Sequence, residues 1–235
     1  MNLSPHISQK FNAELNNIRA KALTMGGIVE KQLTDGINAL IQGDAAVAEM
    51  VVNSDYKVNA MEVSIDEECT QIIARRQPTA SDLRLVVAII KTITDLERIG
   101  DEAERIGRLA MNLSTIERPK SNYIELEHLG NHVRNMLHDT LDAYARTDEV
   151  AALEIAKRDI IIDREYESIL RQMITFMMED PRQIRRSLDV IWVARSLERI
   201  GDHARNICEY IIYLVKGKDV RHTSFEQIEK TLQSP

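Results

Sequence analysis

The sequence is poor in aromatic residues, glycine, proline and cysteine. Aromatic side chains make up 4% of the 235 residues, and there are 9 glycines, 5 prolines and 2 cysteines. Cys69 and Cys208 are isolated, with no CxxC pair, which indicates a reducing cytoplasm and two small core residues. Because Leu, Ile, Val, Ala and Met are plentiful, the composition favours helix-on-helix packing.

The sequence also lacks a basic character and long apolar runs. Lys and Arg total 30 against 37 Asp and Glu, a formal net charge of −7, which argues against nucleic-acid binding. No run of about 18 apolar residues is present, so we expect no direct membrane insertion. The first residues lack the apolar core of a secretory signal. These features predict a cytoplasmic protein.

Motifs of common enzymes are missing. The sequence has no GxxxxGK[ST] phosphate loop, no GxGxxG and no GxSxG. A di-iron bundle needs a Glu-x-x-His on each of two helices, and Glu125–His128 is the single match. We therefore expect a protein that is not an enzyme.

What the sequence has in abundance is helical periodicity. Apolar residues recur at helical spacing in the proline-free stretches, as in Val51, Val58, Ile65 and Ile72. Helix caps are expected at Asp44, Asp148, Asp180 and Gly217, with Pro181 at a first helical position. The pattern predicts six helices, at residues 8–42, 45–75, 81–114, 123–146, 149–179 and 182–216.

The second half of the sequence repeats the first. Residues 39–55 align with 143–159, and "LERIGD" occurs at Leu96–Asp101 and again at Leu197–Asp202. A repeat of about a hundred residues is too long for a solenoid unit. We predict an all-α fold of two tandem three-helix bundles, one over residues 1–116 and one over 117–217. Residues 218–235 are expected to form a tail, partly helical.

Each LERIGD copy places two acids four residues apart on one helix face, at the border of the apolar stripe. The preceding predicted helix carries a similar pair in each half. Two antiparallel helices could bring these oxygen pairs face to face, as Mg²⁺, Ca²⁺, Mn²⁺, iron or Zn²⁺ would require. The candidate metal ligands are Asp55, Asn59, Glu97 and Asp101 in the first half, and Asp159, Asp163, Glu198 and Asp202 in the second.

Ion pairing is the alternative interpretation of these acids. Arg98 and Arg105 flank Asp101, and Arg199 and Arg205 flank Asp202, so the acids could form pairs on a solvated face. Against this, like charges at i,i+4 and a glycine inside a helix both cost stability. Both copies retain these costs, which favours a compensating ligand.

A basic turn separates the second and third predicted helices. The segment "ARRQPTASDLR" at residues 74–84 includes Arg75, Arg76 and Arg84 around a proline. It is interpreted either as a helix stop followed by a cap, or as a docking loop whose arginines pair with carboxylates on a partner.

The duplicated "DLERIGDEAERI" and "SLERIGDHARNI", with "RRQPTASDLR" before the first copy, resemble the PhoU family. The similarity extends from residues 6–15 to 213–222. It implies two similar three-helix bundles and E(D)xxxD motifs, which in some members bind iron or zinc. Carried over by position, the motif falls on the acid pairs named above, but Asn59 replaces an expected aspartate and makes the first site the weaker one.

The resemblance also implies a function. Members repress the phosphate-starvation response by linking the phosphate transporter's ATPase subunit to a phosphate-sensing histidine kinase. We therefore expect a non-enzymatic signalling adaptor that limits phosphate uptake. A metal-dependent enzyme or metal-storage bundle is the alternative, and a purely structural bundle with paired acids is a third. Because residues 85–110 carry two apolar stripes, a homodimer is also expected.

Overall fold

The computed structural model describes residues 5–115 and 123–233, and its regular elements within them are all helical. The first half contains α1 (Pro5–Gln42), α2 (Ala45–Val52), α3 (Tyr56–Arg76) and α4 (Ala80–Ser114). The second contains α5 (Ile124–Arg146), α6 (Glu149–Ala156), α7 (Asp159–Glu179), the 3₁₀ turn η2 (Pro181–Gln183) and α8 (Ile184–Lys216). A last helix, α9, covers Phe225–Gln233. The all-α fold class predicted from the sequence is confirmed.

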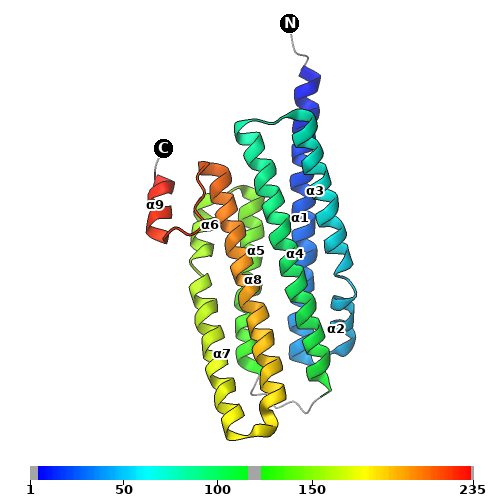
Figure 1. Ribbon diagram of the computed structural model, residues 1–235, viewed down its shortest axis with the longest axis vertical. Helices are drawn as coiled ribbons and strands as arrows, with labels where there is room; N and C mark the ends of the chain where they lie inside the picture. The colour runs from blue at the N-terminus through cyan, green and yellow to red at the C-terminus, as the bar shows by residue number, and fades with distance from the viewer. Residues whose placement is uncertain (1–4, 116–122, 234–235) are drawn as a thin grey trace.

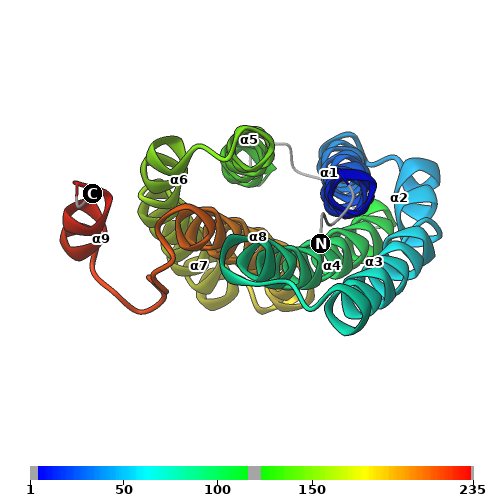
Figure 2. The ribbon, with the colours of Figure 1, turned by 90° about the horizontal axis from the view of Figure 1, so that it is seen from above.

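The long helices run along one axis and form two bundles side by side (Figure 1). The central helices α4 and α8 are antiparallel neighbours, with α1, α2 and α3 on one side and α5, α6 and α7 on the other (Figure 2). The α1 and α5 helices also meet, where the Arg19 guanidinium donates to the carbonyl oxygen of Ala145 at 2.9 Å. The arrangement of two tandem bundles therefore holds.

Two of the six expected helices are each divided in two. The expected helix over 45–75 breaks at Asn53–Asp55, and the one over 149–179 breaks at Lys157–Arg158. At both breaks a backbone hydrogen bond of the 3₁₀ type (i→i−3) appears, as from Ser54 N to Val51 O at 3.1 Å. The prediction was wrong because the apolar period continues through the break: Val51 and Val58 are both buried.

The expected caps and stripes are present. The Asp44 carboxylate accepts from the backbone N–H of Ala46 at 3.0 Å, and Asp148 accepts from Ala151 N–H at 2.9 Å. Gly217 ends α8 with φ +69°, a left-handed conformation that favours glycine. Cys69 and Cys208 are buried free thiols, as expected for core residues. The core is continuous through both bundles.

The C-terminal helix α9 packs against α6 of the second half (Figure 1). Lys157, at the end of α6, forms an ion pair with Glu229 at 2.7 Å, and Val220 and Ile228 are buried. The tail is thus partly helical, as predicted. Among the described residues, no helix is long and apolar enough to cross a membrane.

Candidate functional site

The LERIGD segments lie in the centre of the molecule, where α4 and α8 pack together. Ile99 and Ile200, at matching positions of the two copies, are fully buried. Polar pairs with buried members also join the two helices. Asp95 Oδ1 lies 2.7 Å from His203 Nδ1, and the Arg199 guanidinium donates to Glu102 Oε1 at 2.7 Å. Such pairs fix the register between the halves, because shifting it would leave buried polar groups without partners.

On the side of α4 that faces α3, five residues form what we call the first cluster: Asp55 just before α3, Asn59 and Glu62 of α3, and Glu97 and Asp101 of α4. The Asn59 amide donates to Asp55 Oδ2 at 2.9 Å. Burial raises the pKa of Asp55, and the charges of Asp101 and Glu104 raise it further. Burial also raises the pKa values of Glu97 and Asp101. The structure thus brings together the four predicted first-half ligands and adds Glu62.

The second cluster lies at the equivalent place in the other half and consists of Asp159 and Asp163 of α7, and Glu198 and Asp202 of α8. Burial raises the pKa of Asp159 to about 6. Burial and the neighbouring charge of Asp202 raise the pKa of Asp163. All four predicted second-half residues therefore contribute to one acidic surface.

Arginines enter the second cluster directly. The Arg205 guanidinium donates to Asp159 Oδ2 at 3.2 Å, and Arg195 donates to Glu198. Of the arginines expected to pair with Asp101 or Asp202, Arg105 and Arg199 instead lie within 4 Å of Glu102. Ion pairing thus accounts for part of the second cluster, through partners that the spacing did not indicate.

The helix breaks and the repeat glycines position the buried aspartates. Asp55 adjoins the first residue of α3, and Asp159 is the first residue of α7. A Cβ atom on Gly100 would lie 3.4 Å from Asp55 Oδ1, and one on Gly201 would lie 3.3 Å from Asp159 Oδ1. The glycine of each copy therefore lets an aspartate approach the central helix closely. One oxygen of each aspartate lies against the glycine.

Buried carboxylate oxygens without hydrogen-bond partners indicate whether a cation would fit at the clusters. Asp55 Oδ1, Asp159 Oδ1 and Glu198 Oε2 are buried and have no hydrogen-bond partner among the described residues. Carboxylate oxygens without donors, beside further acids, are a donor set suited to a hard cation. Within residues 5–115 and 123–233, however, no three His, Cys, Asp or Glu side chains are already arranged to hold a metal ion. A cation would have to draw the acids together.

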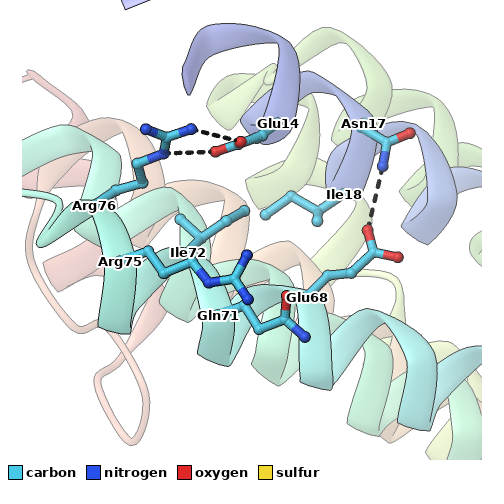
Figure 3. Close-up of a pocket in the computed structure, with 8 residues that line it drawn as sticks. All are labelled: Glu14, Asn17, Ile18, Glu68, Gln71, Ile72, Arg75 and Arg76. Carbon is cyan, nitrogen blue, oxygen red and sulfur yellow. Dashed lines mark hydrogen bonds and ion pairs between the residues drawn. The ribbon is translucent and has the colours of Figure 1, made fainter. Parts of the chain in front are cut away.

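The three arginines of the basic turn have different surroundings, and Figure 3 shows those of Arg75 and Arg76. Arg76 forms two hydrogen bonds to the Glu14 carboxylate, at 2.7 and 2.9 Å. Arg84 packs against Gly217 at the end of α8, where an added Cβ would lie 2.2 Å from its guanidinium. Arg75 is exposed and lines a hollow of about 140 Å³ between α1 and α3. Arg76 and Arg84 therefore hold helices together, and Arg75 remains open to a partner.

Several residues at the clusters escaped the sequence reasoning. Gln32 of α1 is buried near Asp55, and Arg195 enters the second cluster; Arg205 was expected to pair with Asp202 and contacts Asp159 instead. Aligning the two halves position by position gives a signal for them, because Gln32 then corresponds to Met136 and Arg205 to Glu104. Polar residues that the repeat does not retain are candidates for a role in one half only.

Comparisons with known proteins agree with the geometry. Residues 22–110 and 126–211 each match the family model described as PhoU domain. A phosphate-specific transport system accessory protein PhoU homolog from Pseudomonas putida is 54% identical, with 98% of this chain and 90% of the relative covered. The phosphate-specific transport system accessory protein PhoU of Escherichia coli (strain K12) is 51% identical over 99% of this chain and 96% of its own length.

Two solved structures are similar as well. The crystal structure of PhoU from Pseudomonas aeruginosa has a TM-score of 0.86 and 53% identity, covering 88% of this chain and all of that one. The structure of a phosphate transport system regulatory protein PhoU from Streptococcus pneumoniae has a TM-score of 0.83 and 30% identity, covering 89% and 99%.

Proposed function

The chain belongs to the PhoU family, and we propose that it is a cytoplasmic accessory protein of a phosphate-specific transport system that represses the phosphate-starvation response. The observation that carries this proposal is a sequence identity of 54% and 51%, over nearly the whole chain, to proteins named as accessory proteins of that system. Those relatives are named as accessory or regulatory proteins and not as enzymes. In this role the chain limits phosphate uptake and acts through its surfaces.

The proposed partners are the transporter's ATPase subunit and a phosphate-sensing histidine kinase. Arg75 is the proposed contact of the basic turn, since Arg76 is held by Glu14 and Arg84 packs against Gly217. An exposed guanidinium beside a hollow is suited to bidentate pairing with a carboxylate.

Deletion and complementation test the regulatory role. A deletion strain is expected to express phosphate-scavenging genes even when phosphate is plentiful, as measured with a transcriptional reporter. Complementation with the parent should restore repression, and Arg75→Glu should restore less of it at equal protein level. Arg76→Ala is the matched control, which should lower stability more than repression. Normal repression in the deletion strain would reject the regulatory role; normal repression with Arg75→Glu would reject only the contact.

We also propose that divalent or iron cations (Mg²⁺, Mn²⁺, Zn²⁺ or iron) bind at the acidic clusters. Asp55 and Asp101 would hold one in the first half, and Asp163 and Asp202 in the second; Asn59, Glu97, Asp159 and Glu198 complete the sets. The cation would supply positive charge that offsets the repulsion between the carboxylates. The buried oxygens of Asp55 and Asp159 that have no hydrogen-bond partner among the described residues support cation binding.

Metal analysis after dialysis and reloading tests the cation proposal. The double variants Glu97→Gln/Asp101→Asn and Glu198→Gln/Asp202→Asn should each lower the metal content, with helix content by circular dichroism unchanged. Metal content equal to the parent in both variants excludes these residues as ligands.

A homodimer is proposed through a surface other than the one expected. The apolar stripes of α4 are covered within the chain, by α1 on one side and α8 on the other. On α8, however, Ile184, Leu188 and Trp192 lie four residues apart and are each more than 40% exposed. Such a stripe suits a self-complementary contact. Light scattering of the parent should give a dimer mass, and Leu188→Glu a monomer mass.

A further inference from the structure

A buried glutamine of α1 points its carbonyl oxygen at the first cluster. Gln32 is 5% exposed, and its Nε2 donates to Ser54 Oγ at 3.0 Å. The Ser54 hydroxyl itself donates to the carbonyl oxygen of Val51 at 2.9 Å. Since that hydroxyl has a single proton, it must accept from Gln32, which fixes the orientation of the amide. Oε1 is therefore the atom on the side of Asp55.

Two buried oxygens without donors lie next to Gly100. Neither Gln32 Oε1 nor Asp55 Oδ1 has a hydrogen-bond partner among the described residues. Both lie against Gly100, where a Cβ atom would be 3.6 Å from Gln32 Oε1 and 3.4 Å from Asp55 Oδ1. Leaving polar atoms buried and unpaired destabilises the fold, and a carbonyl oxygen beside a carboxylate is a pair that a hard cation satisfies.

The second half neutralises part of its cluster with arginines instead of adding an oxygen from the first helix of the bundle. The position of Gln32, twelve residues before the capping Asp44, is taken by Met136, twelve residues before Asp148. Met136 is buried and offers no oxygen. The Arg205 guanidinium donates to Asp159 Oδ2 at 3.2 Å, and Asp159 Oδ1 keeps no partner among the described residues.

No arginine among the described residues forms a hydrogen bond or ion pair with an acid of the first cluster; Arg98, Arg108 and Arg199 act on these acids only through their charges. The LERIGD offset of 101 residues places Glu104 where the second half has Arg205, and Thr94 where it has Arg195. Glu104 adds negative charge, and the side chain of its ion-pair partner Arg108 is 63% exposed. The first cluster is therefore the less neutralised of the two.

We infer that Gln32 is an additional oxygen ligand of the first cluster, and that this cluster, and not the second, is the tighter cation site. This rests on the proposed binding of cations at the clusters. Asn59 does not weaken the first site, because its amide hydrogen orients Asp55 Oδ2 and leaves Oδ1 free to coordinate. In the second cluster, Arg195 and Arg205 compete with any added cation.

Titration of the full-length, chelator-stripped protein with Mn²⁺, followed by electron paramagnetic resonance of the free ion, tests the inference. Gln32→Met copies the second half and should weaken the tightest site about tenfold, in the range seen when residues supporting a metal site are removed. Gln32→Glu keeps an oxygen at the position and should bind at least as tightly as the parent. Asp163→Asn, in the second cluster, should leave the tightest site unchanged.

The possible outcomes distinguish the role of Gln32 from the proposed binding of cations at the clusters. A parent that binds no Mn²⁺ rejects both. A parent that binds Mn²⁺ with the same affinity as Gln32→Met, or whose tightest site disappears in Asp163→Asn, rejects the inference and leaves cation binding intact. If Gln32→Met is less stable than the parent, Gln32→Glu provides the decisive comparison, because it keeps the oxygen.

Discussion

The two halves of the molecule share one frame but neutralise their acids differently. Both have a helix break before a buried aspartate, a glycine against that aspartate, and a second acid pair on the central helix. In the second half, arginines bind the cluster acids directly; in the first, a glutamine oxygen and further acids face one another. Duplication has thus retained the backbone geometry while the charges around it changed.

A reversed ion pair produces the difference. In the first half, Glu104 precedes Arg108 by four residues, and in the second, Arg205 precedes Glu209 by four. Both are i,i+4 pairs with the same net charge. Reversing the order of acid and arginine therefore changes the stability of the isolated helix by only a few tenths of a kcal/mol. Only the reversed order places the arginine against Asp159. Local charge balance therefore does not reveal which cluster is neutralised.

The largest effect is expected from removing the internal cation of the second half. Arg205→Ala leaves Asp159, which is 2% exposed, facing Asp163 and Asp202 without its donor. We expect the free energy of unfolding at pH 7, without added metal, to fall by about 2–3 kcal/mol. Urea unfolding of parent and variant measures the change, and added Mn²⁺ should restore part of it by occupying the vacated position.

Glu104→Ala is the matched control in the first half. It breaks an ion pair whose arginine is 63% exposed, so the change should stay within about 0.5 kcal/mol. Equal losses from Arg205→Ala and Glu104→Ala would show that the halves do not differ in how their acids are neutralised.

A smaller effect is expected where α2 approaches α4. A Cβ on Gly107 would lie 3.1 Å from the carbonyl oxygen of Ala48, which is backbone and cannot rotate away. Gly107→Ala should therefore destabilise the protein by about 1–2 kcal/mol, although alanine is the better helix former. Gly27→Ala is the control: no atom lies within 4 Å of its Cβ position, so a gain of up to about 1 kcal/mol is expected. If the midpoint of thermal unfolding shifts in the same direction for both variants, the close approach of α2 to Gly107 does not determine the effect.

The tail gives a third test, because α9 packs against the second half. The Phe225 ring lies 5.8 Å from the Arg205 guanidinium carbon. Phe225→Ala should cost about 1 kcal/mol or less in overall stability and loosen α9. Hydrogen exchange should become faster in residues 218–233 and in α6, with α2 in the first half unchanged as an internal reference. Unchanged exchange in α9 would mean that Phe225 does not hold the tail.

The sequence predicted the parts of this structure that depend on repeated, local patterns. Apolar stripes located the long helices, and Asp44, Asp148 and Gly217 marked their ends, because caps act within a few residues. The acid pairs were found because their spacing recurs in both halves. The two helix breaks were missed, since breaks of only three and two residues with nearly helical torsions do not disturb the apolar period.

Contacts between distant segments could not be predicted. Gln32 and Asp55 come together only because α1 packs beside the start of α3, and Arg205 turns to Asp159 only because α7 begins there. The interpretation of Arg84 as a docking residue failed to anticipate its packing on Gly217, 133 positions away in the sequence. Such pairings follow from the tertiary fold and have no local signature.

The smallest expected effect concerns the contact that joins the halves through α1 and α5. His138 Nδ1 lies 2.8 Å from Glu30 Oε1, and this hydrogen bond raises the pKa of His138 above its ordinary value of 6.5. A raised histidine pKa stabilises the fold fully below pH 6.5, and the contribution is lost as pH rises through the folded-state pKa. Because the His138 side chain is 66% exposed, the contribution is at most about 1 kcal/mol. His138→Gln should therefore be less stable than the parent at pH 6 and equal to it at pH 8.5, as measured by urea unfolding. His132→Gln is the control, since His132 contacts Glu165 at 2.9 Å within the second half. A parent-minus-variant difference for His138 that does not change with pH would mean that the contact between the halves carries no charge.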